Sequence, residues 1–577
     1  MTYINWNNQE TGKRAQFVAD VFRESLFNYA FDSNKVPSLN LHYFCEEYMI
    51  VYALYKKGIM QKGNLNPLNQ EFEWIIDNSP WLPEGVSDSI FFFQNHEGRY
   101  QDIKKDKSLD VAKRAEYYND CAIYVDGLLS SKQGYFELLM QNMKRILVES
   151  SFDISDQKML FFCVREFICE LMNHGISKAY LYTKATEALF SEIEPEDDIK
   201  YILGFLNKLK PQKQEYSVIL GVTKPTFTEL HKKIGKMRDA TIDEMKILGK
   251  KHIIEYEIVS FDPFSAVDAA RADVEVILNT YNCFVHNKNI TTCKHGLVKR
   301  KAAPEYEKIY DVPNYMRRNQ MKPKEERISM LVNTVTGAMP YSLINSISLH
   351  NIAINSDEPK TQLMMLWTIF ELLVETSQNT MDRVNYISNA VSTVLCLRYY
   401  RHSIGTLLMG IMNELSLEDI LQKEVRGKDS FEKFAFILKD NTVLQQEIEN
   451  DILKYPLMAY KFKSLCVLFS SKESVKHDLC RHADRVRWQL MRIYRNRCMI
   501  VHDGKHLPYL TSVLENLHFY VDEMIEFLLN CVIMGMTNPS TAMTYARVRE
   551  KEMMSILDNK SCPLSDEDFM KLVFSKL

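Results

Sequence analysis

The sequence predicts a mainly α-helical protein that contains one small α+β unit. Three observations predict this fold class. Apolar residues recur at helical spacing in most of the chain. A short region, residues 215–298, instead shows the alternation and the breaks that are typical of strands. A charged segment with several prolines then separates this region from an almost wholly helical C-terminal part.

The composition is that of an ordinary folded protein. The chain has 577 residues, of which 46% are hydrophobic and 25% charged, so we expect two to four domains. A net charge of -4 argues against a surface that coats nucleic acid throughout, although it allows a local basic patch. A polar N-terminus and the lack of about 18 consecutive uncharged apolar residues favour a cytoplasmic protein with no membrane partner. The 12 cysteines show no framework spacing and are expected to be reduced thiols.

Residues 1–214 form the predicted helix-rich N-terminal region, of unassigned role. Apolar residues at helical spacing predict helices over Glu137–Glu149 and Lys158–Met172. The acidic segment 194–198 is expected to be a loop that leads into a helix start, because carboxylates favour the positive end of a helix dipole.

Residues 215–298 form the predicted small α+β unit. Tyr216–Val222 and Ile253–Val259 are expected to be strands, and Ser265–Tyr281 a helix that follows the break at Asp262-Pro263.

Residues 299–327 are predicted to be a charged linker, because Pro304, Pro313 and Pro323 break helices and few apolar residues are present. Its basic residues include Lys299, Arg300, Lys301, Arg317, Arg318, Lys322 and Lys324. A solvated connector is the simpler interpretation. The alternative is an RNA-contacting segment, with Lys299, Arg300, Arg317 and Arg318 as the candidate RNA-binding side chains.

Residues 328–545 are predicted to be a helical bundle, followed by tail helices over 546–577. Helical periodicity predicts helices over Thr361–Thr376, Met381–Tyr400, Asp484–His502 and Leu510–Met534. Gly504 directly follows the third of these, and glycine is the usual residue at a helix C-terminal stop.

The chemically informative segment is 493–504, IYRNRCMIVHDG, where two arginines and a histidine lie close together at the end of a predicted helix. Arg495 and His502 are seven positions apart, nearly two full turns, and so share a helix face. Arg497 precedes His502 by five positions and lies roughly 140° around the helix from it. Arg497 therefore acts differently from Arg495, or the helix distorts near its end.

These residue types suit RNA cleavage. Histidine titrates near neutrality and can transfer a proton, whereas arginine is a permanent bidentate partner for phosphate. A base can accept the proton of the RNA 2′-hydroxyl while a guanidinium stabilises the pentacovalent phosphate. This chemistry needs no metal or other cofactor and leaves DNA uncut. On spacing alone, however, basic residues near a helix C-terminus are more often simple partners of the helix dipole.

The segment resembles the R-x4-6-H signature of the HEPN superfamily, in the form found in Apea-like domains of abortive-infection proteins. The resemblance aligns Arg497 with the motif arginine and His502 with the motif histidine. Arg495 is then a preceding basic residue, or itself the motif arginine at the longer spacing. The family usually has a polar residue, often Asn, after this arginine. Here Asn496 follows Arg495 and Cys498 follows Arg497, which leaves the assignment of the principal arginine open.

The resemblance extends upstream and covers roughly residues 328–545. The segment 366–373, LWTIFELL, is similar to the family's apolar helix with an aromatic residue and a Glu, and Ser342–Ile354 resembles its lead-in helix. Glu371 is then a candidate accessory group near the motif, although an ordinary ion-pair partner explains a lone helix Glu equally well. His506 and Asp503 are further candidates for lining the cleft, and Asn496 for binding RNA.

The resemblance implies a helical HEPN bundle that pairs with a second copy, so that two motifs face one RNA. It implies a metal-independent endoribonuclease, acting in antiphage abortive infection, that leaves a 2′,3′-cyclic phosphate and a 5′-hydroxyl. The N-terminal half would sense a phage-derived trigger or restrain the nuclease. One alternative is a non-catalytic HEPN scaffold that acts with a partner nuclease. Another is a regulator that binds nucleic acid through residues 299–324 without turnover.

Two weaker patterns have the residue types of zinc ligands. The first is Cys283, His286, Cys293 and His295, and the second is His477, Cys480 and His482. Both spacings are irregular, so no metal site is expected from either. The sequence has no phosphate-binding glycine loop and no H-E-x-x-H motif, which removes support for the common nucleotide-binding and metalloprotease classes.

Overall fold

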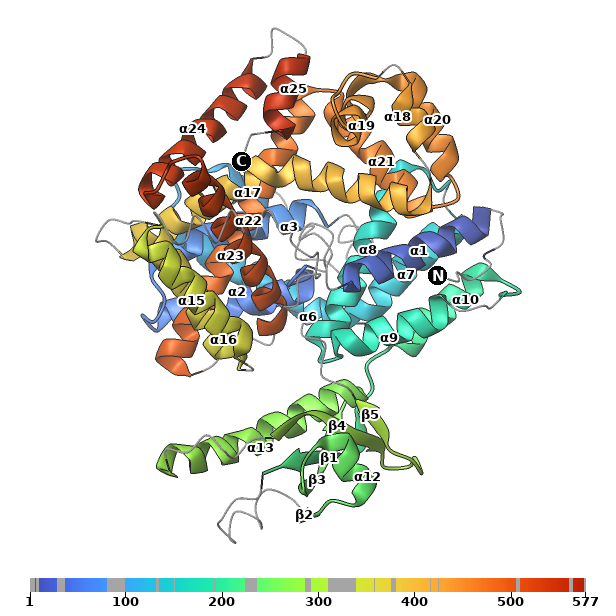
Figure 1. Cartoon of the computed structure of the whole chain (residues 1–577), viewed down its shortest axis with the longest axis vertical. Helices are drawn as coiled ribbons and strands as arrows, with labels where there is room; N and C mark the ends of the chain where they lie inside the picture. The colour runs from blue at the N-terminus through green and yellow to red at the C-terminus, as the bar shows by residue number, and fades with distance from the viewer. Residues whose placement is uncertain are drawn as a thin grey trace.

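The protein is mainly helical with one small antiparallel sheet, as the sequence predicts (Figure 1). The structure, a computed structural model, describes residues 6, 10–27, 37–79, 99–130, 134–149, 151–190, 194–223, 236–285, 292–309, 339–356, 358–374, 380–415, 417–423, 425–504, 509–559 and 564–574. In this part of the chain, no helix is both long and apolar enough to cross a bilayer. Every cysteine described is a free thiol.

The N-terminal region is a set of helices that pack around one apolar core. They are α1 (Glu10–Leu26), α2 (Leu41–Lys56), the short 3-10 helix η1 (Lys62–Asn64), α3 (Leu65–Asp77), α6 (Val111–Leu129), α7 (Gly134–Glu149), α8 (Ile154–Asn173), α9 (Lys178–Leu189) and α10 (Asp198–Lys208). The two helices expected over 137–149 and 158–172 are confirmed as α7 and α8. The expected helix start is also confirmed, because the Asp197 side chain accepts a hydrogen bond from the Lys200 backbone N–H, at 2.9 Å, and caps α10.

The α+β unit lies apart from the main helical body (Figure 1). Its sheet has the order β2 (Lys236–Asp239), β3 (His252–Ser260), β1 (Gln214–Val222), β4 (Thr292–Arg300) and β5 (Glu307–Ile309), with antiparallel neighbours throughout. The unit also contains the short helix α12 (Ile242–Leu248), and α13 (Pro263–Val285) packs on the sheet around a separate small core. At Gly296 on β4, an added Cβ would lie 2.9 Å from Val267 of α13, so the close approach of helix and strand requires glycine.

The linker predicted over 299–327 begins too early. Residues 299 and 300 end β4, and β5 follows, so the α+β unit extends through 309. The sequence hides β4 because its residues, TCKHGLVKR, do not alternate: Leu297 and Val298 are adjacent, as are Lys299 and Arg300. Residues 310–327 lie outside the described part of the chain.

The described residues of the C-terminal region form helices joined by short loops and contain no strand. Its helices are α15 (Tyr341–Asn355), α16 (Pro359–Leu373), α17 (Thr380–Glu414), α18 (Glu418–Gln422), α19 (Ser430–Asp440), α20 (Thr442–Ile452), α21 (Pro456–Phe469), α22 (Lys472–Asp503), α23 (Leu510–Ile533), α24 (Pro539–Asp558) and α25 (Asp566–Val573). The expected helices are confirmed, several with greater length. The predicted boundary at 545/546 is wrong, because it falls inside the continuous helix α24.

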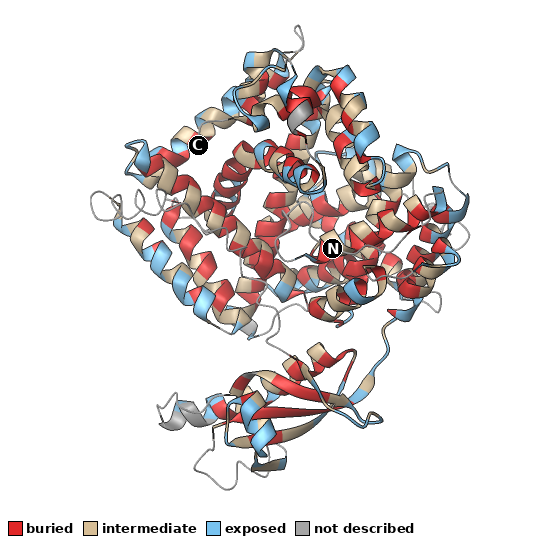
Figure 2. Ribbon diagram, turned by 45° about the vertical axis from the view of Figure 1, so that its right-hand side comes forward, coloured by how far each residue is buried: buried red, intermediate tan, exposed pale blue. Residues whose placement is uncertain are grey.

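The N-terminal and C-terminal helices share a single hydrophobic core rather than forming separate domains. The core runs between the layers of helices, as the buried faces in Figure 2 show. Trp74 of α3 and Trp488 of α22 meet with ring centroids 5.8 Å apart, and Lys178 of α9 pairs with Glu515 of α23 at 2.9 Å. The motif helix is therefore held by both halves of the chain.

Candidate functional site

The motif segment forms the last turns of α22, a continuous helix of 32 residues. Ser471 caps its start by accepting a hydrogen bond from the Ser474 backbone N–H. Gly504 ends it in the left-handed conformation (φ 66°), which confirms the predicted stop. No break occurs between the two arginines and the histidine, so the distortion that would align Arg497 with His502 is absent.

Helix α16 lies alongside these last turns. The Lys360 ammonium donates a hydrogen bond to the Gly504 carbonyl at 3.2 Å, and the rings of Trp367 and Tyr494 lie 5.5 Å apart. The segment 366–373, which carries part of the resemblance, therefore packs directly on the motif helix.

Arg495 is a buried structural residue. Its side chain is 1% exposed, and its Nη2 and Nε donate to Glu47 Oε1 of α2 at 2.7 and 3.2 Å. One turn earlier, Arg492 donates to Glu47 Oε2 at 2.8 Å and to Glu71 Oε1 of α3 at 2.6 Å. The prediction that Arg495 binds the scissile phosphate is wrong, because its guanidinium is buried and forms an ion pair with the Glu47 carboxylate.

Both carboxylates in this network respond to the arginines. Burial alone would raise the pKa of Glu47, but the Arg492 and Arg495 guanidiniums outweigh it and hold that pKa below its ordinary value. Burial raises the pKa of Glu71, which lies close to Glu47 and, among the described residues, is paired directly with Arg492 alone. Glu47 is therefore the anchoring acid of this network.

Asn496 is also buried. Its side chain is fully buried, and its Nδ2 donates to the Arg492 carbonyl at 3.0 Å, one turn earlier on the same helix. The prediction that it binds RNA is wrong for the same reason as for Arg495: the turn 492–496 faces the N-terminal half.

Arg497 and His502 lie toward the surface. Arg497 is partly buried, with an Nε that is buried and has no hydrogen-bond partner, and His502 is exposed in the last turn. They are five positions apart on a regular helix, about 7.5 Å along the axis and roughly 140° around it. A single chain therefore presents them as two separate groups.

Glu371 of α16 lies beside the motif, as expected. Its carboxylate accepts a hydrogen bond from the Trp367 indole at 3.0 Å. The pKa of Tyr494 is raised to about 12, chiefly by burial; Cys498 and Glu371 also raise it, whereas Arg497 lowers it. The same acid and arginine flank the thiol of Cys498, whose pKa burial also raises. Arg497 and Glu371 thus share one neighbourhood on the helix surface.

The other predicted RNA-binding residues do not join this neighbourhood in the described chain. Lys299 and Arg300 belong to β4 of the α+β unit, where the Lys299 ammonium lies over the Tyr306 ring at 4.6 Å. Arg317, Arg318 and His506 lie outside the described residues, as does the side chain of Asp503.

Among the described residues, neither of the two weak zinc patterns brings its side chains together. Cys293 is buried and its Sγ accepts from the Gly221 backbone N–H at 3.0 Å, while the His295 ring contacts the Ile247 carbonyl. Cys283 is exposed on α13, and His286 lies outside the described residues. On α22, His482 stacks on Tyr399 in the core, whereas His477 faces solvent.

Sequence reasoning missed Glu47 and Glu71. A signal was present, because Arg492 and Arg495 stand three positions apart among apolar residues on a long helix. Buried guanidiniums require acids, but the acids come from a part of the chain with no recognisable pattern.

No family model, curated protein or solved structure matches this chain. The interpretation of the motif therefore depends on Arg497, His502 and the residues around them.

Proposed function

We propose that this protein is a metal-independent endoribonuclease of the HEPN kind, with Arg497 binding phosphate and His502 transferring the proton. One observation supports this proposal most directly. Of the three motif candidates, Arg495 is buried in an ion pair with Glu47. Arg497 and His502 both lie toward the surface near the end of one continuous helix. The shorter spacing, R-x4-H, is thus the available one.

The chemistry is a transesterification. The RNA 2′-oxygen forms a bond to the adjacent phosphorus as the bond from phosphorus to the 5′-oxygen breaks. His502 accepts the 2′-hydroxyl proton, and a proton is delivered to the departing 5′-oxygen. The Arg497 guanidinium stabilises the charge that develops on the phosphate oxygens. The products are a 2′,3′-cyclic phosphate and a 5′-hydroxyl.

The separation of the two groups on one helix supports a homodimer. Two copies with α22 ends facing one another would supply an arginine and a histidine from both sides of a single phosphate. Large apolar side chains are exposed on α15 and α16 and beside His502. They include Tyr341 (79%), Ile352 (51%) and Ile354 (42%) on α15, Leu372 (38%) on α16 and Val501 (48%) beside His502. A second copy would cover such side chains.

The role that fits this site is an antiphage abortive-infection effector of the cytoplasm, with the N-terminal half as sensor or restraint. Support comes from the buried network of Glu47, Arg492 and Arg495. Any trigger that moves α2 also acts on the motif helix, because Glu47 binds two of its arginines.

The test is RNA cleavage by the purified full-length protein in EDTA. We expect cleavage with cyclic-phosphate and 5′-hydroxyl ends, lost by at least about a hundredfold in His502→Ala and Arg497→Ala. His477→Ala and Arg487→Ala are matched controls, since both residues lie toward solvent on the same helix, and both should retain full activity.

Three results contradict the proposal: products with 5′-phosphate ends, full activity in both motif variants, or salt-sensitive RNA binding with no turnover. The last result would instead favour the non-catalytic scaffold or the nucleic-acid-binding regulator.

A further inference from the structure

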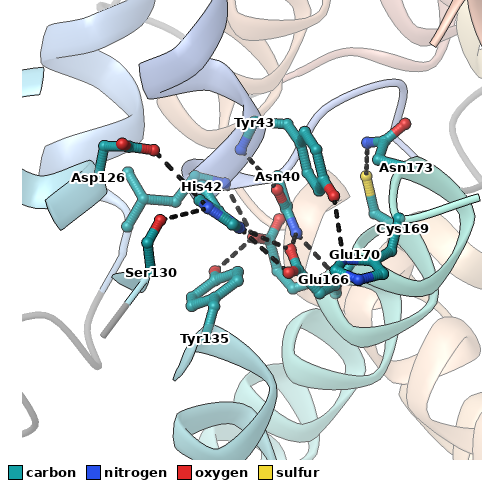
Figure 3. Close-up of polar contacts among 12 residues, drawn as sticks. Asn40, His42, Tyr43, Asp126, Ser130, Tyr135, Glu166, Cys169, Glu170 and Asn173 are labelled. Atoms are coloured by element: carbon teal, nitrogen blue, oxygen red, sulfur yellow. Dashed lines mark hydrogen bonds and ion pairs between the residues drawn. The ribbon is translucent and has the colours of Figure 1, made fainter. Parts of the chain in front are cut away.

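A second polar cluster lies in the N-terminal half, between α2, α6 and α8 (Figure 3). His42 and Glu46 stand four positions apart on α2 and so share one helix face, and Asp126 of α6 lies opposite them. One nitrogen or oxygen atom of each of these three side chains lies within 4.8 Å of those of the other two. Among the described residues, this is the one group of His, Cys, Asp and Glu side chains with such spacing.

The imidazole of His42 is held from behind by a carboxylate. Its Nδ1 lies 3.1 and 3.3 Å from the two oxygens of Glu170 on α8. Glu170 is fixed in turn by Asn40, whose Nδ2 donates to it at 2.8 Å. A carboxylate behind the ring places the proton on Nδ1 and leaves the Nε2 lone pair free to bind a cation. This arrangement accompanies most histidines that ligate metals.

The front of the ring faces oxygen atoms. His42 Nε2 lies 3.2 Å from the Ser130 hydroxyl and 3.7 Å from Asp126 Oδ1, the latter too far for a hydrogen bond (Figure 3). Asp126 Oδ1 is itself buried and has no hydrogen-bond partner among the described residues. A buried carboxylate oxygen without a donor is costly unless a cation or a proton satisfies it.

The charges of the cluster do not balance. Three carboxylates, Glu46, Asp126 and Glu170, surround a single imidazole. A divalent cation would stabilise the Glu46 and Asp126 carboxylates in their ionised form.

We propose that His42 Nε2, Glu46 and Asp126 bind a divalent transition-metal ion, with Glu170 orienting the imidazole. A single imidazole with two carboxylates suits Mn²⁺ or Zn²⁺, whereas Ca²⁺ and Mg²⁺ prefer sets made of oxygen alone. Ser130 Oγ lies close enough to His42 Nε2 to complete the coordination or to bind a metal-bound water.

The ion would act on structure rather than on RNA cleavage. It would join α2 to α6, and the next residue on α2, Glu47, holds the motif helix α22. Metal binding therefore stiffens the helix through which the N-terminal half holds Arg492 and Arg495. The site is independent of the proposed ribonuclease chemistry, which needs no metal.

The test uses the full-length protein after dialysis against EDTA and then against buffer. Titration with MnCl2, and separately with ZnCl2, is followed by calorimetry and by metal analysis of the desalted protein. We expect one equivalent of at least one ion to bind and the melting temperature to rise. His42→Ala and Asp126→Asn should each weaken binding by at least about tenfold, and Glu170→Gln by about ten- to a hundredfold.

His477→Ala and Asp120→Asn are the matched controls, a solvent-facing histidine on α22 and an exposed aspartate on α6. Both should bind like the unchanged protein. Circular dichroism identifies any variant that fails to fold, and Glu46→Gln then replaces it. Failure of both ions to bind at millimolar concentration, or equal binding by the ligand variants and the controls, would overturn the site. Because no readout involves RNA, this result is separate from the fate of the proposed nuclease.

Discussion

Two successive segments of α22, residues 492–496 and 497–502, contain similar polar residue types but differ in burial. In the turn 492–496, two arginines and an asparagine are buried and bound to Glu47, Glu71 and the helix backbone. In the turns 497–502, an arginine and a histidine lie toward the surface. The difference is one of partners: the first set faces the N-terminal half of the chain and the second does not. An arginine's role on a helix thus depends on what packs against it.

Helical geometry by itself favoured Arg495, which the structure buries against Glu47. Arg495 shares a face with His502, but about two turns before the helix ends that face packs against the N-terminal half and is buried. Its partner Glu47 lies 448 positions earlier in the chain. A buried guanidinium is stable only with a hydrogen-bonded acid, so Arg495 and Glu47 form one structural unit.

The largest effect is expected from removing Glu47, the acid that Arg492 and Arg495 share. Glu47→Ala leaves two guanidiniums buried without their main partner, and we expect the free energy of unfolding to fall by about 3–5 kcal/mol. Urea denaturation measures this loss. Glu137→Ala is the control, because the Glu137–Lys210 pair is exposed and should contribute less than about 1 kcal/mol. Equal losses would mean that the buried network does not hold α22.

A double-mutant cycle sharpens the contrast between the two arginines. Arg495→Ala should cost about 3 kcal/mol of stability, and Arg497→Ala at most about 1 kcal/mol. In the Glu47→Ala background, the cost of Arg495→Ala should largely disappear, while that of Arg497→Ala should stay unchanged. Thermal or urea unfolding of the single and double variants gives the coupling energies. A measurable coupling energy between Arg497 and Glu47 would contradict the division of α22 into a buried segment, 492–496, and an exposed segment, 497–502.

The pH dependence of stability tests what a buried acid does when cations do not dominate its surroundings. Asp20 of α1 faces Glu24 and Glu414 as well as Arg23 and Lys461, and burial raises its pKa to about 7. Between pH 4 and 7 the folded protein then keeps a proton that the unfolded chain loses, so stability falls as pH rises. Asp20→Asn should remove this fall.

The measurement is urea unfolding at pH 4.5 and pH 8. At pH 8 the variant should be more stable than the unchanged protein by about 1–2 kcal/mol, and near pH 4.5 the two should be similar. Glu47 should behave in the opposite sense, since its pKa is lowered: the stability that it contributes is present at neutral pH and lost only in acid. A variant that gains equally at both pH values would show that Asp20 ionises normally.

The sequence predicted most helices, because their apolar spacing is local information. α7, α8, α13, α16 and α23 lie within a few residues of their expected bounds. β4 was not predicted, because its charged residues do not show a strand pattern and its pairing with β1 and β5 is not local information. The division into separate N-terminal and C-terminal domains failed for a similar reason, since the shared core joins residues far apart in sequence. At the motif, the helix stop at Gly504 was predictable, whereas the burial of Arg495 depends on an acid that no local pattern reveals.

The smallest expected effect concerns the end of the exposed turns. Gly504 adopts φ 66°, and a Cβ added there would meet no atom within 4 Å, so Gly504→Ala introduces backbone strain without a clash. We expect a stability loss of about 1 kcal/mol, confined to the last turn of α22. Hydrogen exchange should then rise for amides near His502 and stay unchanged around Arg495, because the buried turn is anchored by Glu47. If protection instead fell equally along residues 492–502, these residues would unfold as one unit, and the buried network would not hold residues 492–496 independently of the exposed end of the helix.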